Sequence, residues 1–183
     1  GLLSPDAALT CFSLTGYSGG GKKMIAQYEA GGDPLLEAPR QYGLGQQHKH
    51  LPEMAAQCGL TLDPVFCPIV SDYYAGMEVT VPVFARDLKG TLEDVNALYQ
   101  GYYGDGLVRY AEAPDEGGFL SAGALAGRDD MEISVLGNGD RLLLVARFDN
   151  LGKGASGAAI QNMNLLLGLE ETAGLVLGGP SHG

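Results

Sequence analysis

The sequence has little positive charge and no long hydrophobic run. Its 11 lysines and arginines stand against 22 aspartates and glutamates, which gives a net charge of −11. Nucleic acids and anionic membranes both bind basic surfaces, so this balance argues against either partner. The longest apolar cluster, residues 142–146, has the length of a strand and is far too short to span a bilayer.

Cysteine is also scarce. Cys11, Cys58 and Cys67 are odd in number and show no CxxC spacing, which argues against a disulfide framework. They predict free thiols in a reducing compartment, and therefore a cytoplasmic protein. The chain starts on Gly1 without an initiator methionine or a signal-peptide pattern, so we expect it to be cut from a longer protein. Its 183 residues are enough to bury a sizeable core without disulfides.

Twenty-nine glycines divide the chain into short elements. Strands are expected at residues 9–14, 64–70, 77–85, 107–111, 131–136 and 141–148, the last two joined by a Gly-Asn-Gly-Asp turn. Residues 77–85 alternate most clearly, and Pro82 within them predicts an edge strand or a bulge. Residues 115–130 are glycine-rich and irregular, and His182 in the tail is expected in solvent.

Helices are expected in four places. The first starts at about Met24 and stops at Gly31, the second covers residues 51–57, and the last runs from the glycine-rich stretch 152–157 to about Leu167. A capping box at Thr91 starts the remaining helix. Its apolar face is predicted to comprise Val95, Leu98, Tyr99 and Tyr102.

Two of the three histidines lie in residues 47–53, Gln-His-Lys-His-Leu-Pro-Glu, directly ahead of a predicted helix. Histidine titrates near neutral pH and is the usual proton carrier in catalysis, so His48 and His50 are candidates for an acid and a base. The stretch could instead be a surface loop, or bind zinc together with Glu53 or a cysteine. No second close pair of ligands would complete a structural zinc site, and we predict no metal.

Two glycine-rich segments approach nucleotide-binding motifs. Residues 16–22 spell GxxxxGK between a strand and a helix, but Lys23 stands where a P-loop needs Ser or Thr to bind magnesium. Residues 152–157 match GxGxxG, but too few residues follow for a second βα unit. We expect these later glycines to let a helix pack closely on a sheet.

Three motifs together resemble one family, the N-acetyl-gamma-glutamyl-phosphate reductases. Residues 15–22 are similar to that family's Ser-Gly-x-Ser-Gly-Ala/Gly-Gly-Arg/Lys loop, although Thr15 stands where serine is usual. Residues 48–53 match its His-Arg/Lys-His-x-Pro-Glu string. Residues 149–162 match its Asp-Asn-Leu-x-Lys-Gly-Ala-Ser-Gly-x-Ala-x-Gln-Asn run. The motifs occur in the family's order and look like the shorter of its two types.

The resemblance implies an α+β fold, with a mixed or antiparallel sheet covered by helices on one face, as in the C-terminal domain of glyceraldehyde-3-phosphate dehydrogenase. Residues 1–150 would form the catalytic and dimerisation domain. Residues 151–183 would form a C-terminal helix and tail that return to an NADP-binding Rossmann domain outside this chain. The uncovered face would meet a partner subunit in a homo-oligomer, a dimer or a tetramer. Tyr73, Tyr74 and residues 77–85 would lie there, although the core is an equal alternative for the valines.

The resemblance also implies a reaction. N-acetyl-glutamyl 5-phosphate is reduced with NADPH to N-acetyl-glutamate 5-semialdehyde and phosphate through a cysteine thioester, a step of arginine biosynthesis. By the family match His48 is the acid/base, with His50 as the fallback. The substrate and its phosphate are assigned to Lys22, Lys49, Ser18 and Gly19, with Lys23 equally well placed in solvent. The NADP contacts are assigned to Gly16, Asn150 and Asn162.

The family's nucleophile is a cysteine in an Asn-Pro-Gly-Cys-Tyr motif, which this sequence lacks. The resemblance places that motif upstream of Gly1, and none of the three cysteines present has those neighbours. We therefore expect part of a reductase that is inactive by itself. Two alternatives stay open: a non-catalytic dimerisation module of the same fold, and a reductase similar to aspartate-semialdehyde dehydrogenase.

Overall fold

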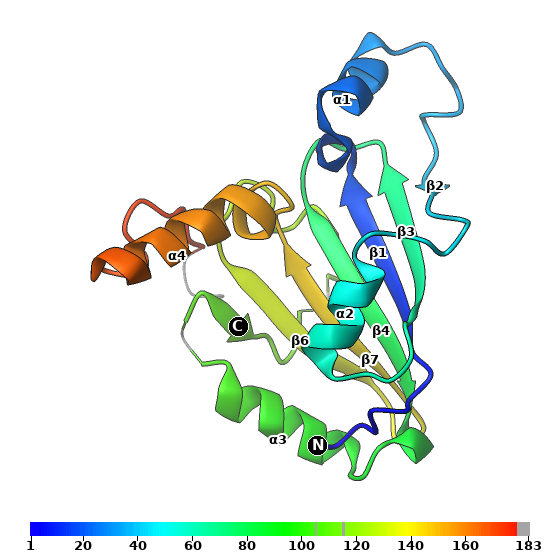
Figure 1. The fold of residues 1–183 in the computed structure, drawn as a ribbon, viewed down its shortest axis with the longest axis vertical. Helices are drawn as coiled ribbons and strands as arrows, with labels where there is room; N and C mark the ends of the chain where they lie inside the picture. Colours follow the sequence, from blue (N-terminus) through cyan, green and yellow to red (C-terminus); the bar gives the residue numbers. More distant parts are fainter. Residues whose placement is uncertain (105, 115, 179–183) are drawn as a thin grey trace.

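The computed structural model describes residues 1–104, 106–114 and 116–178. Within this part, seven strands form a sheet in the order β2-β3-β1-β4-β7-β6-β5 (Figure 1). β1 is parallel to β3 and β5 is parallel to β6, whereas the other neighbours are antiparallel. In chain order the strands are β1 Thr10–Gly16, β2 Arg40–Gln41, β3 Val65–Ser71, β4 Met77–Phe84, β5 Val108–Tyr110, β6 Met131–Gly137 and β7 Arg141–Phe148.

The α-helices of the described chain are α1 Gly21–Ala30, α2 Leu51–Cys58, α3 Leu92–Tyr102 and α4 Gly157–Leu167. Two apolar clusters fix α2 and α3 on the same face of the sheet (Figure 1). Leu51 of α2 packs with Phe66, and Val95 of α3 packs with Leu142. The predicted class, a mixed sheet with helices on one face, is confirmed.

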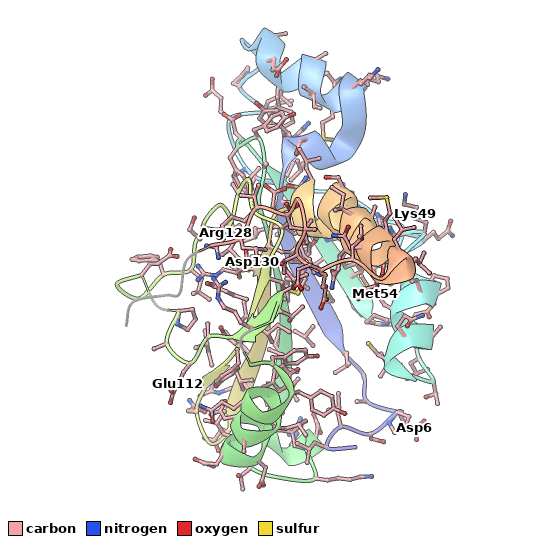
Figure 2. The ribbon with its side chains drawn as sticks, turned by 90° about the vertical axis from the view of Figure 1, so that its left-hand side faces the viewer. Asp6, Lys49, Met54, Glu112, Arg128 and Asp130 are labelled. Atoms are coloured by element: carbon pink, nitrogen blue, oxygen red, sulfur yellow. The ribbon has the colours of Figure 1, made fainter. Side chains whose placement is uncertain are left out.

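The opposite face of the sheet carries apolar side chains that no helix of the described chain covers. Strand alternation and register put Phe12, Phe84 and Leu143 on this face, with exposed fractions of 40%, 51% and 40%. Figure 2 shows the sheet from the side, with Lys49 and Met54 on the helical side and Glu112 on the other. Residues 114, 116 and 121 contact Arg147 on this second face, so their segment covers the β6–β7 part, whereas Phe12 and Phe84 on β1 and β4 stay exposed.

Pro82 does not mark an edge or a bulge, so that prediction is wrong. β4 lies inside the sheet, between β1 and β7, and Pro82 pairs with Leu143 of β7. The pairing of β4 with β1 ends at Thr80, so Pro82 has a strand neighbour on one side only. A proline is tolerated there because it leaves no ladder hydrogen bond unmade on its free side.

The α3 helix starts with the predicted capping box. The Oγ1 of Thr91 accepts from the Asp94 N–H at 3.2 Å, and the Oδ2 of Asp94 accepts from the Thr91 N–H at 2.8 Å. Its apolar face is narrower than predicted. Val95 is 4% exposed and Tyr99 packs against the core, but Leu98 and Tyr102 are exposed. The helix has one apolar stripe because it touches the sheet along one line only.

Other boundaries differ by a few residues. β1 continues to Gly16, where a loop was expected, and α1 begins at Gly21 rather than at Met24. The irregular region and the hairpin at residues 131–148 appear as predicted, with Asp115 and His182 outside the described residues. In the part of the chain described, no helix is long and apolar enough to cross a membrane.

Candidate active site

A cavity of about 730 Å³ opens on the helical face of the sheet. His48, Lys49 and His50 line it from the segment ahead of α2, and Gly19 and Asn150 line it from the ends of β1 and β7. Among the described residues that line it, none is an aspartate, a glutamate or a cysteine. In a chain with 22 acidic residues, this cavity is therefore a place where an anion meets no carboxylate.

The glycine turn after β1 is held by a neighbouring loop. The N–H of Tyr17 donates to the Tyr73 carbonyl at 2.9 Å, and the N–H of Ser18 donates to the Tyr74 carbonyl at 3.1 Å. A Cβ on Gly16 would lie 2.5 Å from the carbonyl oxygen of Tyr74, which no side chain can tolerate. Gly16 therefore allows close backbone packing, whatever the cavity binds.

Asn150 joins the two sides of the cavity wall. Its Oδ1 accepts from the Gly76 N–H at 2.8 Å, and its Nδ2 donates to the Oγ of Ser18 at 2.9 Å. The preceding Asp149 is 2% exposed, and its carboxylate accepts N–H groups from residues 127, 151 and 152. The Asp-Asn pair thus fixes the end of β7 against the glycine turn.

His48 is half-buried against the ring of Phe66, with 5.1 Å between the ring centroids. The His50 N–H donates to the Nδ1 of His48 at 3.3 Å, which favours the neutral tautomer that carries its proton on Nε2. Burial, followed by the charges of His50 and Lys49, lowers the pKa of His48. The ring is therefore neutral near pH 7 and can offer an N–H donor to the cavity.

The structure brings six of the predicted site residues around this one cavity. They are Gly16, Gly19, His48, Lys49, His50 and Asn150. Ser18 lies behind them, buried and bonded to Asn150. Lys22 and Lys23 do not line the cavity, because they lie exposed on α1, which projects beyond the end of the sheet in Figure 1. Asn162 is exposed on α4, also outside the lining.

Several residues that line the cavity could not be identified as site residues from the sequence. Tyr42, Met54 and Phe148 line the cavity but belong to no motif that names a function. Ser13 also lines it, and its Oγ is buried with no hydrogen-bond partner among the described residues. Only the position of Ser13 within a β-branched run was visible in the sequence, and that indicated a core strand.

The glycines of residues 152–157 serve close packing, but Gly152 and Gly157 pack against a loop and not against the sheet that was expected. They form a π-helical turn, Gly152–Ser156, that leads into α4. A Cβ on Gly152 would collide with the carbonyl oxygen of Arg128, and a Cβ on Gly157 would collide with the carboxylate of Asp129. This turn lies against residues 128–129, so the glycines serve that contact.

A family model described as "Semialdehyde dehydrogenase, dimerisation domain" matches residues 1–150. The chain belongs to this family. Among curated relatives of this dimerisation domain, "N-acetyl-gamma-glutamyl-phosphate reductase 2" of Nostoc sp. is 39% identical over 96% of the chain and 59% of its own length. The N-acetyl-gamma-glutamyl-phosphate reductase of Brucella ovis is 42% identical over 92% of the chain and 57% of its own length. The chain thus spans little more than half the length of these relatives, whose names confirm the predicted resemblance.

Solved structures share the fold. Aspartate semialdehyde dehydrogenase II from Vibrio cholerae superposes on 87% of the chain and 54% of its own with a TM-score of 0.63, at 17% identity. A probable aspartate-semialdehyde dehydrogenase from Pseudomonas aeruginosa gives a TM-score of 0.64 at 14% identity, over 87% of this chain and 55% of its own. At these identities the likeness concerns the fold of the dimerisation domain, not its substrate.

Proposed function

We propose that this chain is the catalytic and dimerisation part of an NADP-dependent reductase that converts N-acetyl-glutamyl 5-phosphate into N-acetyl-glutamate 5-semialdehyde and phosphate. The observation that carries the proposal is the cavity at His48, which has no carboxylate in its described lining and has Lys49 at its wall. An acyl phosphate is anionic, so it is attracted by Lys49 and meets no carboxylate in the described lining. The names of the curated relatives supply the substrate class.

The proposed reaction needs a proton donor and a proton acceptor. A cysteine sulfur attacks the acyl carbon, phosphate leaves with the bonding electrons, and a thioester forms. Each tetrahedral stage places negative charge on the former carbonyl oxygen. The Nε2–H of neutral His48 suits that oxygen as a hydrogen-bond donor. As the acid/base of the reaction, His48 is also proposed to accept the thiol proton. His50, whose ring lies 4.9 Å from that of His48, is the fallback for this acid/base role.

The described residues fit only the reacting end of NADP. NADPH, when bound, supplies the hydride that reduces the thioester. Gly19 and Asn150 are the proposed contacts at that end, since both line the cavity and a Cβ on Gly19 would meet only the Asn150 and Thr15 side chains, at 3.6 and 3.7 Å. Asn162 lies outside the cavity lining, so it could contact only a part of the cofactor that extends beyond the cavity. The remainder of the cofactor is assigned to a separate Rossmann domain.

The nucleophile is proposed to lie outside this sequence. Cys11, Cys58 and Cys67 are all absent from the cavity lining. Burial raises the pKa of Cys11 to about 11, which keeps its sulfur a thiol at neutral pH. We therefore expect the chain alone to show no phosphate-dependent NADP reduction with the semialdehyde. Measurable turnover would make one of these three cysteines a nucleophile after all.

The open face of the sheet is the proposed contact in a homo-oligomer, consistent with a family named for dimerisation. Of the predicted interface strand, the valines lie on the helical side, where Val83 is 6% exposed, so they belong to the core. Phe84 is on the open face and remains a candidate. Tyr74 is also exposed, whereas Tyr73 is half-buried.

The C-terminal part, residues 151–183, is proposed to return to the NADP-binding domain. Leu165, Leu166 and Leu167 at the end of α4 are 56%, 88% and 65% exposed, which is unusual for leucines on one helix turn. Packing on a second domain would bury them. Three free thiols, one exposed, favour the cytoplasm as the location.

A fusion protein tests the proposal. The portion of the Brucella ovis reductase that this chain does not match is joined ahead of Gly1, and NADP reduction is measured with the semialdehyde and phosphate. Activity with N-acetyl-glutamate semialdehyde supports the proposed substrate, and activity with aspartate semialdehyde alone supports the rival reductase. A folded fusion inactive with both, beside an active Brucella enzyme, supports the non-catalytic dimerisation module.

A further inference from the structure

The loop ahead of His48 contains an unusual backbone angle. Gln46 has a φ of 51°, in the left-handed region that glycine adopts readily and that other residues avoid. Among the described residues, it is the only non-glycine residue with a positive φ. Such a conformation costs on the order of 1 kcal/mol or more and persists where the surroundings hold it. The turn alone would be served better by glycine, as at the neighbouring Gly43.

The side chain of Gln46 explains why glutamine occupies this position. Its Nε2 donates to the carbonyl oxygen of Phe66 at 2.8 Å, and its Oε1 accepts from the Phe66 N–H at 2.9 Å. Phe66 is 4% exposed, so both of its backbone groups need partners. One side-chain amide satisfies them together.

The rest of the outer edge of β3 shows which backbone hydrogen bonds the Gln46 side chain replaces. Near its end β3 pairs with the backbone of β2, and the Tyr42 N–H donates to the Pro68 carbonyl at 3.0 Å. At Phe66 the Gln46 amide takes the place of a neighbouring strand. Because a side chain closes the edge there, the backbone of residues 47–50 need not continue along β3. His48 rests on the Phe66 ring at an interplanar angle of 68°.

We propose that Gln46 is a positioning residue for His48. Its amide ties residues 43–50 to Phe66 and thereby holds the imidazole at the cavity wall. The catalytic meaning of this role rests on the proposed function of His48. The positioning itself is a property of this chain and is measured without any reaction.

The test uses NMR on the full chain with three variants. Gln46→Ala removes both hydrogen bonds. Gln46→Asn has a side chain one methylene shorter, so its amide does not reach Phe66, but asparagine tolerates the left-handed conformation. This variant therefore separates the effect of the two hydrogen bonds from the effect of the turn. Gln47→Ala is the matched control, since Gln47 is an exposed neighbour that makes no hydrogen bond to Phe66 or His48 within the described residues.

Two signals are followed, the hydrogen exchange of the Phe66 amide and the cross-relaxation between the His48 and Phe66 rings. In both Gln46 variants, Phe66 exchange is expected to accelerate by roughly 5- to 150-fold, the factor that corresponds to about 1–3 kcal/mol. The ring-to-ring signal is expected to disappear. In Gln47→Ala, both signals are expected to stay as in the parent chain.

Persistence of the ring-to-ring signal in the Gln46 variants overturns the proposal. If Phe66 exchange has then accelerated, Gln46 only closes the sheet edge; if it has not, the two hydrogen bonds do not form in solution. Slow exchange of the Leu14 amide, in the centre of the sheet, shows that a variant is folded. If Gln46→Ala fails this check, Gln46→Asn decides the outcome. An inactive fusion protein leaves this result standing, and a negative result here leaves the proposed function intact.

Discussion

Two regions of this molecule use the same kinds of side chain in opposite ways. Around His48, basic groups face a cavity whose described lining has no carboxylate. On the other side of the sheet, under residues 111–130, three arginines are paired with acids. The Nη2 of Arg147 lies 3.0 Å from Glu132, and the Nη2 of Arg128 lies 2.5 Å from Asp130 (Figure 2). Charges that neutralise each other hold the structure, and charges left without a partner are available to a ligand.

Burial separates the two regions further. Asp130 is 2% exposed and Arg147 is 5% exposed, whereas Lys49 is exposed. Arg109 also bonds both Asp130 and Glu132, which links the pairs into one network. Burial alone would raise the pKa of Asp130, but hydrogen bonding to Arg128 and the nearby guanidinium charges outweigh it and lower that pKa. The following predictions test whether the first region is functional and the second structural, in order of decreasing effect.

The largest effect is expected from Asp130→Asn. The substitution leaves Arg109 and Arg128 without their shared buried carboxylate, so the free energy of unfolding should fall by about 3–5 kcal/mol. Urea denaturation of the chain measures this loss. Asp140→Asn, at an exposed hairpin position, is the control and should change stability by less than about 0.5 kcal/mol. Equal stability of the two variants would remove the structural role of the network.

The reverse pattern is expected for His48→Gln. In the fusion protein, kcat should fall by about 10²–10³-fold, the usual loss for one donor to a developing oxyanion. The unfolding free energy should stay close to that of the parent, because His48 is only half-buried and makes one long hydrogen bond. A stable variant with full activity would show that His48 is not the donor, and the same assay on His50→Gln would then identify the fallback.

The pH dependence of the fusion protein should reflect the neutral His48. Because burial and neighbouring charge lower the pKa of this histidine, its neutral form persists below its ordinary value of 6.5. Accepting the thiol proton requires the neutral ring, so the acidic limb of the kcat profile should lie below pH 6.5, and activity should decline only as the pH falls through the lowered pKa. A limb at or above 6.5 would mean that another group controls the reaction.

The smallest effect concerns phosphate binding by lysines. Lys49→Met should weaken binding of inorganic phosphate to the chain by about 2- to 5-fold at low salt, as expected for an exposed charge. Lys22→Met is the matched control and should have no effect, because Lys22 lies on α1 away from the cavity lining. NMR titration measures both. Equal losses would indicate attraction by the overall charge rather than by a site.

Much of the fold could be predicted because its signals are local. The alternation of residues 77–85, the Thr91 capping box and the turn at residues 137–140 each depend on neighbours within a few positions. The predictions for Pro82 and for the apolar face of α3 failed for a different reason. Whether a strand has neighbours on one side or two, and which line of a helix meets the sheet, depends on segments far away in the sequence.

The motifs predicted some residues of the site correctly and others wrongly. His48 and Asn150 lie 102 positions apart by their numbers, yet both line one cavity, as their family motifs implied. Gln46 and Tyr42 belong to no motif, because their roles depend on hydrogen bonds to the edge of β3, which is distant in the sequence. Lys22, by contrast, matched a motif but lies outside the cavity lining.

The sequence by itself determined the family, the order of strands and helices along the chain, and the absence of the Asn-Pro-Gly-Cys-Tyr motif, because these are properties of residue types and spacing. Only the tertiary structure decided which charges are paired and which are free. That distinction arises when the sheet forms, because the strands bring Glu132 beside Arg147 on one face, where Asp130 also pairs with Arg128. The basic groups beside His48 remain available because no strand or loop brings a carboxylate into the described lining of their cavity.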